Sequence, residues 1–257
     1  MDPRDDQALL CLAAKLARRA AEVIMQIREQ GFAVARKSDA SPVTAADHAA
    51  EALIVAGLRA ATPEIPVVAE EEVTGGRLTA AGPVFWLVDP LDGTREFAAG
   101  RDEFAVNVGL VRDGRPVLGA VALPASGQVY GGIVGTGAWQ QDQEGRKEPI
   151  NARPPPAAGL DVMASRHYAG DPKLAAWLKG RAVASVTNIG SAMKFCRLAE
   201  GKADLYPRLG RTMEWDTAAP QAVLEAAGGH VTTFEGAPLR YGKPGWENPP
   251  FIGSGKE

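Results

Sequence analysis

The chain has 257 residues, of which 46% are hydrophobic and 23% charged, as in one ordinary globular domain or two closely packed ones. The formal net charge of -3 excludes a general nucleic-acid coat protein, because such a protein needs a basic surface. The opening sequence MDPRDDQALL lacks a secretory signal pattern, and no apolar run reaches the length of a membrane span. We therefore expect a cytoplasmic protein, with a peripheral association with the inner membrane left open.

Two amphipathic helices are predicted near the start of the chain. Over residues 5–30, leucine, valine and isoleucine recur at helical spacing, and Gly31 ends the pattern as a C-cap. The next helix covers residues 44–60, with Thr44 as its N-cap. Asp47, three positions on, has two interpretations of similar weight, namely the acid of a capping box and a functional carboxylate.

The segment between these helices is polar and rich in turn-forming residues. It covers residues 32–42 and contains Lys37. One interpretation is a solvated loop. The other is a mobile flap that brings a lysine to a phosphate site.

Two predicted strands end in acidic residues. Residues 67–69 form a short apolar strand that runs into three glutamates at 70–72. Residues 85–88 form a second apolar strand, followed by Asp89 and Asp92. Consecutive glutamates usually lie in a solvated loop, but two strands that both end in acids could bring those acids together. Because close carboxylates repel one another, a hard divalent cation such as Mg²⁺ is their natural partner.

The motif DPLDGT after the second strand adds features that suit a phosphate. Pro90 fixes φ and forces a turn that swings the two acids to one side. Gly93 lets the backbone approach a ligand, so that N–H groups at the start of a helix could bind a phosphate. Metal-binding acids beside such a cradle indicate phosphoryl transfer to water.

The rest of the first half predicts a meander of short strands, so the half consists of two helices covering an antiparallel sheet. An Asp-Gly pair at 113–114 is typical of a hairpin turn. The predicted strands cover residues 103–112, 116–123, 128–134 and 137–141. Three prolines at 154–156 then mark a boundary. We expect an N-terminal α+β half over residues 1–150 and a C-terminal α/β half over residues 151–257.

The second half alternates strands and helices. Strands are predicted over 161–165, 183–188, 203–206, 230–233 and 251–252, and helices over 171–179, 191–200 and 214–227. Asp216 lies in the first turn of the last helix, where an acid can simply complement the helix dipole. Cys11 and Cys196 both lie in helical patterns, and we expect reduced core residues rather than a disulfide.

Three blocks of this sequence resemble the inositol monophosphatase superfamily, whose members are magnesium-dependent, lithium-sensitive phosphatases. The blocks are VVAEEE, WLVDPLDGTREF and EWDTAAPQAVLEAAGG. The resemblance implies a layered αβαβα sandwich. Within the superfamily, DPLDGTREF, GSAMKFCRLAEGKADLYPR and TMEWDTAA are most similar to the CysQ-type 3'(2'),5'-bisphosphate nucleotidases.

The resemblance also implies roles for individual residues. It implies that two or three Mg²⁺ ions are held by Glu70, Asp89, the Leu91 carbonyl, Asp92 and Asp216. Thr94, hydrogen-bonded to Asp47, would orient the attacking water, and Glu71 would support a metal-bound water. The substrate would contact Glu70, Leu91, Asp92, Gly93, Thr94, Ser191, Lys194, Arg208 and Asp216. Lys37 would lie in the mobile flap, and Lys194 has a solvated helix lysine as its alternative.

By this resemblance the protein removes the 3'-phosphate of adenosine 3',5'-bisphosphate, giving AMP and phosphate without a covalent enzyme intermediate, as a step of sulfur metabolism. The alternatives are an inositol-1-phosphate or sugar monophosphatase and a non-catalytic regulator that binds metal or phosphate. The partner would be a small phosphate ester, and a homodimer stays open. The sequence departs from the nucleotidase pattern at ASRHY, where His167 either replaces a shifted histidine or the contact to the base is lost.

Overall fold

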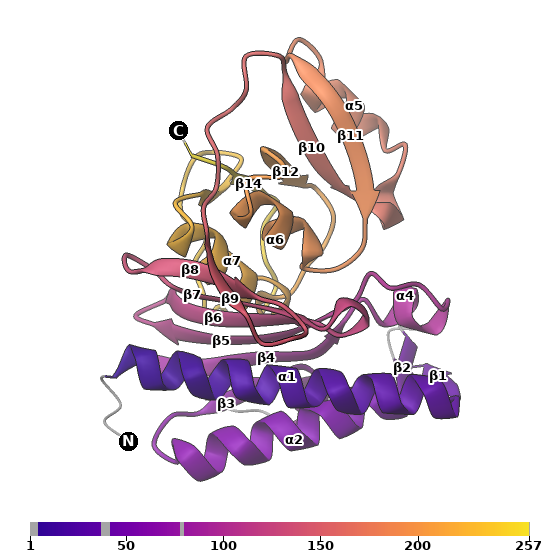
Figure 1. The fold of residues 1–257 in the computed structure, drawn as a ribbon, viewed down its shortest axis with the longest axis vertical. Coiled ribbons are helices and arrows are strands. Elements are labelled where there is room, and N and C mark those ends of the chain that lie inside the picture. The colour runs from indigo at the N-terminus through magenta and orange to yellow at the C-terminus, as the bar shows by residue number, and fades with distance from the viewer. Residues whose placement is uncertain (1–4, 37–41, 78–79, 257) are drawn as a thin grey trace.

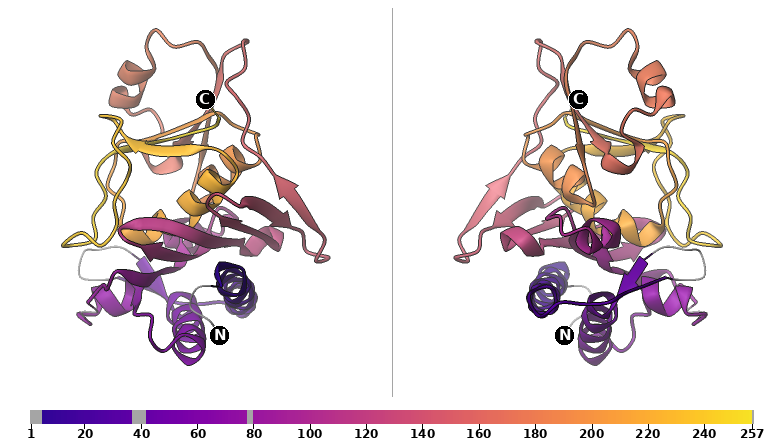
Figure 2. Two further views of the ribbon diagram at one scale, coloured as in Figure 1. Left: turned by 90° about the vertical axis from the view of Figure 1, so that its left-hand side faces the viewer. Right: turned by 90° about the vertical axis from the view of Figure 1, so that its right-hand side faces the viewer.

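The computed structural model describes residues 5–36, 42–77 and 80–256, and its elements are stacked in layers (Figure 1). Two long helices form the first layer, a seven-stranded sheet the second, two helices the third and a five-stranded sheet the fourth, with another helix outside. Figure 2 shows the third layer enclosed between the two sheets. The expected αβαβα sandwich is confirmed.

The first layer consists of α1 (Asp6–Gln30) and α2 (Ala45–Ala61), each within one residue of its predicted range. Gly31 ends α1 with φ at +82°, a conformation that glycine adopts without strain. A capping box begins α2. The Thr44 side chain accepts a hydrogen bond from the backbone of the first turn, and the Asp47 side chain accepts one from the backbone N–H of Thr44. The apolar faces of both helices pack on the seven-stranded sheet.

The seven-stranded sheet follows the order of the chain. Its strands are β3 (Val67–Ala69), β4 (Val84–Asp92), β5 (Ala105–Arg112), β6 (Arg115–Leu123), β7 (Gln128–Ile133), β8 (Gly137–Gln141) and β9 (Lys147–Ile150). Neighbours are antiparallel except β3 and β4, which are parallel. The predicted turn at Asp113 and Gly114 is confirmed, with positive φ at both residues. The strand β9 was not predicted, because its charged residues and Pro149 suit only a sheet edge.

The five-stranded sheet is mixed, with strands in the order β11-β10-β12-β14-β13. These are β10 (Leu160–Ser165), β11 (Val183–Ile189), β12 (Leu205–Arg208), β13 (His230–Thr233) and β14 (Phe251–Ser254). The strand predicted at 203–206 therefore begins two residues later and includes Pro207. A proline is tolerated there because β12 pairs with β10 only at Leu205.

Helices α6 (Met193–Ala199) and α7 (Ala218–Ala226) lie between the sheets, and α5 (Pro172–Leu178) lies outside. The helix predicted at 214–227 is divided, since Thr217 has φ at -121° and separates a 3-10 turn from α7. The remaining short elements are β1 (Val34–Arg36), β2 (Pro42–Thr44), α3 (Glu70–Thr74), α4 (Thr94–Ala98), η1 (Pro124–Ser126), η2 (Arg166–Tyr168) and η3 (Glu214–Asp216).

Two hydrophobic clusters form the core. One lies under α1 and α2, and the other lies between the sheets and takes residues from both sides of the proline-rich segment. The division of the chain at residue 150 stays a prediction. The helix α7 lies very close to β5 and β6, because a Cβ on Gly109 or Gly119 would come within 2.7 Å or 2.3 Å of Ala219. Cys196 is buried as expected, but Cys11 is exposed, so the core prediction was wrong for Cys11.

Candidate active site

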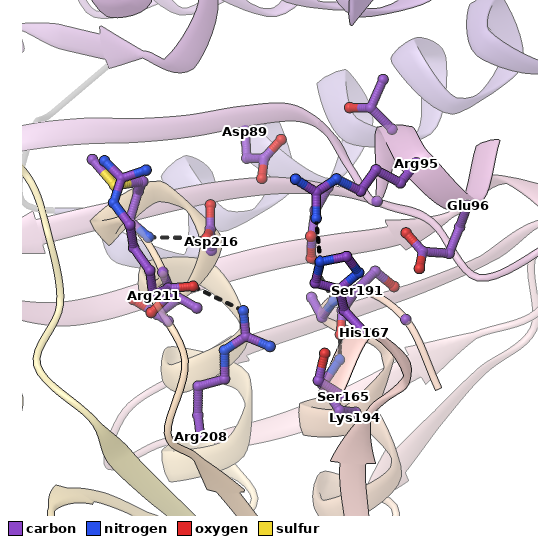
Figure 3. A pocket seen from close by; sticks show the side chains of 18 of the residues that line it. Asp89, Arg95, Glu96, Ser165, His167, Ser191, Lys194, Arg208, Arg211 and Asp216 are labelled. Atoms are coloured by element: carbon purple, nitrogen blue, oxygen red, sulfur yellow. Dashed lines mark hydrogen bonds between the residues drawn. The ribbon is translucent and has the colours of Figure 1, made fainter. Parts of the chain in front are cut away.

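A cavity of about 420 Å³ opens at the ends of β4, β10 and β12, beside the third layer (Figure 3). Ten of the predicted site residues line it: Glu70, Asp89, Leu91, Asp92, Gly93, Thr94, Ser191, Lys194, Arg208 and Asp216. Asp47 and Glu71 lie behind this wall, at 1% and 8% exposure. Lys37 lies outside the described residues, so its flap role stays a prediction.

The two strands that end in acids are neighbours, as the sequence predicts. β3 and β4 run parallel, with Ala69 paired to Val88, so the next residues along each strand, Glu70 and Asp89, reach the same end of the sheet. The carboxylate of Asp89 is 2% exposed. Its Oδ1 accepts a hydrogen bond of 3.0 Å from the backbone N–H of Leu91. The predicted meeting of these acids is confirmed.

The DPLDGT segment forms a bulge and then a helix start. The register between β4 and β5 shifts between Asp89 and Asp92, which brings Leu91 and Asp92 into the cavity wall. Gly93 has φ at +97°, and a Cβ there would lie 2.9 Å from the Glu103 carbonyl, so only glycine fits. The helix α4 begins directly after it.

Thr94 and Asp47 are in contact, and Asp47 also forms the expected capping box, while its catalytic role stays a prediction. The Thr94 hydroxyl lies 3.0 Å from Oδ1 of Asp47 and 3.0 Å from the Leu91 carbonyl. The other oxygen of Asp47 accepts hydrogen bonds of 2.7 Å from the backbone and the hydroxyl of Thr44. One buried carboxylate thus caps α2 and fixes a hydroxyl at the cavity.

Asp216 reaches the cavity from the far half of the chain. It lies in η3, and its Oδ2 accepts a hydrogen bond of 2.9 Å from the backbone N–H of Met213. Figure 3 shows its carboxylate beside that of Asp89. The dipole role that the sequence left open does not account for this placement, because Asp216 precedes α7 and lines the cavity wall.

The acidic end of the cavity carries more negative charge than its surroundings neutralise. Burial, together with the nearby carboxylates of Glu70, Asp92 and Asp216, raises the pKa of Asp89 well above its usual value. Burial and neighbouring acids likewise raise the pKa of Asp216 to about 8, and burial raises that of Asp92 to about 6. Such a set of oxygen ligands fits a hard cation. Among the described residues, no group of three acidic, histidine or cysteine side chains is already arranged around one point.

Asn107 also indicates a missing partner at this end. It lies opposite Asp89 in the β4–β5 pair, so both side chains project from the same face of the sheet. Asn107 is fully buried, and neither its Oδ1 nor its Nδ2 has a hydrogen-bond partner among the described residues. An unsatisfied buried amide costs about 1–3 kcal/mol. A bound water or metal-linked water would remove that cost.

The cavity wall also carries two cations, and both act on the carboxylate of Asp92. Lys194 is 3% exposed and donates hydrogen bonds to the carbonyls of Ser191 and Ile189, at 2.6 Å and 3.2 Å. Its interpretation as a solvated helix lysine is therefore wrong. Burial lowers the pKa of Lys194 to about 8. The guanidinium of Arg208 donates to the carbonyls of Gly210 and Arg211, at 3.1 Å and 2.8 Å, and its charge faces the cavity (Figure 3).

Comparison with known proteins identifies the family. The model of the inositol monophosphatase family matches residues 5–250. The chain belongs to the inositol monophosphatase family. It is 44% identical over 237 residues to a protein of Escherichia coli strain K12 named 3'(2'),5'-bisphosphate nucleotidase CysQ, covering 91% of this chain and 94% of that one. It is 36% identical to the 3'-phosphoadenosine 5'-phosphate phosphatase of Mycobacterium leprae, covering 98% and 92% of the two chains.

Solved structures of the inositol monophosphatase family agree with this assignment. The crystal structure of CysQ from Bacteroides thetaiotaomicron superimposes with a TM-score of 0.80 at 34% identity, over 98% of both chains. That CysQ is described as a bacterial member of the inositol monophosphatase family. The αβαβα arrangement of this chain is thus the arrangement of that family.

Sequence reasoning missed several polar residues of this inositol monophosphatase site. Nη1 of Arg95, in α4, lies 2.7 Å from Nε2 of His167, in η2, so these residues join the two halves at the cavity (Figure 3). Tyr168 lines the cavity next to His167. The Cζ atom of Arg208 lies over the Tyr168 ring, 5.1 Å from the centre of that ring. His167 therefore lies at the cavity. The sequence left open whether it replaces a shifted histidine or whether the contact to the base is lost. Arg95 lies in the motif DPLDGTREF, and its place in that motif could have indicated that it belongs to the site.

Proposed function

We propose that this protein is a Mg²⁺-dependent phosphatase that removes the 3'-phosphate of adenosine 3',5'-bisphosphate, giving AMP and inorganic phosphate. The observation that carries the proposal is the division of the cavity wall between the carboxylates of Glu70, Asp89, Asp92 and Asp216 and the cations Lys194 and Arg208. A substrate with two phosphates matches this division, because one phosphate can be held with metal while the second meets the cations. The names of the curated relatives support the same substrate class.

The acidic end would hold the metal. Glu70, Asp89 and the Leu91 carbonyl are the proposed ligands of one Mg²⁺, and Asp89, Asp92 and Asp216 those of a second, with a third ion left open. When bound, Mg²⁺ supplies positive charge to the phosphate oxygens and lowers the pKa of water. The raised pKa values of Asp89 and Asp216 and the unsatisfied amide of Asn107 support a cation here.

The protein groups would orient the water and the phosphate. Because the Thr94 hydroxyl donates its proton toward Asp47 or the Leu91 carbonyl, its lone pairs are left to accept a hydrogen bond from the attacking water. Glu71, from the same strand end, would support a second water. The N–H groups of Gly93 and Thr94 would donate to the phosphate. The water oxygen bonds to phosphorus as the bond to the 3' oxygen breaks, and the proton that the water loses balances the one that the 3' oxygen takes up.

The cations of the cavity wall would select the substrate. Ser191, Lys194 and Arg208 are the proposed contacts of the 5'-phosphate, because they lie on the wall away from Asp89 (Figure 3). A substrate of this kind arises as a by-product of sulfate activation and sulfonation, so the protein would recycle it. An inositol monophosphate would leave Lys194 and Arg208 without a matching anion.

The direct test is a comparison of two substrates with the purified protein. We expect adenosine 3',5'-bisphosphate to be hydrolysed with a kcat/KM at least about tenfold above that of inositol-1-phosphate, a difference of about 1.4 kcal/mol. Phosphate release should need Mg²⁺, should stop in EDTA and should be inhibited by millimolar lithium. The Asp92→Asn variant serves as the inactive control. A preference of more than tenfold for inositol-1-phosphate would overturn the proposed substrate.

A further inference from the structure

A second acidic residue of α2 holds the chain segment that carries Glu70 and Glu71. Glu51 is 6% exposed, and its carboxylate accepts hydrogen bonds from the backbone N–H groups of Glu71 and Glu72, at 2.7 Å and 2.9 Å. These N–H groups belong to the first turn of α3, where a helix has no internal acceptors for them. The residue before α3 is Ala69, whose side chain cannot accept a hydrogen bond. Glu51 therefore caps α3 from another helix.

The same face of α2 also holds α4. Asp47 and Glu51 are one helical turn apart, so their side chains project from one side of the helix. Asp47 receives the hydroxyl of Thr94, the first residue of α4, while Glu51 receives the start of α3. The elements that follow β3 and β4 are thus fastened to one helix. This arrangement fixes Glu70 and Glu71 relative to Asp89 and Thr94.

The outer side of α3 has a separate anchor. The Glu72 carboxylate forms ion pairs with Arg59 at 2.7 Å and with Arg77 at 2.8 Å, on the side exposed to solvent. Loss of the Glu51 bonds would therefore leave α3 tethered to the protein but able to shift relative to the cavity. A helix of five residues has little stability of its own, so the orientation of α3 depends on its contacts with neighbouring elements.

A role in stability alone explains Glu51 poorly. A buried carboxylate is costly, and burial raises the pKa of Glu51 to about 7 although both backbone donors act to lower it. A neutral cap would fasten α3 without that cost. The carboxylate offers an acceptor to each of two N–H groups at once, which a neutral amide cannot do. The carboxylate of Glu51 therefore fixes the orientation of the first turn of α3.

We propose that Glu51 is a positioning residue of the metal site, which sets the orientation of Glu70 and Glu71 through the first turn of α3. This inference rests on the proposed function, because it takes Glu70 as a metal ligand and Glu71 as the support of a water. Glu51 itself touches neither substrate nor metal.

The test compares three variants in metal-free protein titrated with Mg²⁺ by calorimetry, together with steady-state kinetics on adenosine 3',5'-bisphosphate. Glu51→Gln keeps the size but loses one acceptor and places an NH₂ against an N–H. Glu51→Asp keeps the charge but is too short to reach both N–H groups. Glu72→Gln is the matched control. It makes the same chemical change in α3, at the residue after Glu71, and affects only the outer ion pairs.

We expect both Glu51 variants to bind Mg²⁺ about tenfold or more weakly and to lose kcat by a similar factor, the size of effect typical of residues that orient metal ligands. The KM for substrate should change less than threefold, and Glu72→Gln should match the wild-type protein in both measurements. If Glu51→Asp keeps normal Mg²⁺ affinity, or if both Glu51 variants behave like Glu72→Gln, the inference is overturned. If the wild-type protein neither binds Mg²⁺ nor releases phosphate, the proposed function fails instead.

Discussion

The hydroxyl of Thr94 lies 3.0 Å from Oδ1 of Asp47, and this bond joins the first turn of α4 to the first turn of α2. Thr94→Val removes the hydroxyl while keeping the shape of the side chain. We expect kcat to fall about 100-fold or more, as for the loss of a group that orients a proton transfer, with Mg²⁺ affinity unchanged. Thr94→Ser should recover most of the activity. Steady-state kinetics and calorimetry measure both, and an active valine variant would show that the hydroxyl orients no water.

Much of this site could be predicted from the sequence, because the proposed metal ligands come in short motifs at the ends of strands. Asp89, Asp92 and Thr94 lie within six positions, and a buried strand followed by acids and glycine is visible without a structure. Asp216 could be assigned to the site only through the resemblance to the family, since an acid at a helix start has an ordinary structural explanation. The fold was predicted in its layers, while the edge strand β9 and the break before α7 depended on sheet pairing and local capping.

Glu51 and Asn107 could not be found from the sequence. Glu51 looks like any acid of an amphipathic helix, and only the packing of α2 against α3 shows that it faces inward. Asn107 interrupts an apolar strand, and its importance depends on the register that sets it opposite Asp89. Cys11 shows the reverse error, because it lies on the same exposed stripe of α1 as Lys15, Arg19 and Glu22, and the helical period already assigns it to that face.

Replacing Asp216 by asparagine is expected to stabilise the metal-free protein and to inactivate it. Asparagine can still accept the hydrogen bond from Met213, but it removes a buried charge that neighbouring carboxylates oppose. We expect a gain of about 1 kcal/mol or more, or a Tm in EDTA higher by about 2–4 °C per kcal/mol. Activity should fall at least about 100-fold, because the variant loses a proposed metal ligand.

The control for Asp216→Asn is Glu225→Gln, since burial also raises the pKa of Glu225, which lies outside the cavity. This variant should keep its activity. A lower Tm in EDTA for Asp216→Asn would show that the acidic end of the cavity carries no excess charge.

The stability of the metal-free protein should fall as the pH rises. Because the pKa values of Asp216 and Asp92 are raised from 3.8 to about 8 and about 6, the native state binds more protons than the unfolded state between these limits. The free energy of unfolding therefore decreases with pH across that window. We expect the Tm in EDTA to fall from pH 5 to pH 8 and Mg²⁺ to remove most of the slope. Differential scanning fluorimetry measures both, and a Tm in EDTA that rises over this range would contradict the assignment.

Asn107→Ala should separate a metal-linked role from a structural one. Among the described residues the amide has no hydrogen-bond partner, so its removal relieves an unsatisfied buried group and the Tm in EDTA should not fall. The rise in Tm on adding Mg²⁺ should shrink, because the partner of the amide would be part of the loaded site. Val108→Ala, at the next residue and on the opposite face, is the control. It should lower the free energy of unfolding of the metal-free protein by about 1–3 kcal/mol, and the Tm with it, and keep the full response to Mg²⁺. The reverse pattern in Asn107→Ala would mark a structural residue.

We expect Arg208 to determine how strongly the enzyme prefers a substrate with two phosphates over one with a single phosphate. Arg208→Met removes a cation at the end of the cavity away from Asp89 while keeping a long side chain (Figure 3). A charge-assisted hydrogen bond contributes about 1.5–3 kcal/mol, so the KM for adenosine 3',5'-bisphosphate should rise about tenfold or more. Hydrolysis of adenosine 3'-phosphate, which lacks the second phosphate, should change less than threefold. Arg208→Lys should give an intermediate KM, since it keeps the charge but loses the fork of donors. An equal loss on both substrates would place Arg208 at the reacting phosphate or in the fold, because only a contact to the 5'-phosphate can distinguish the two.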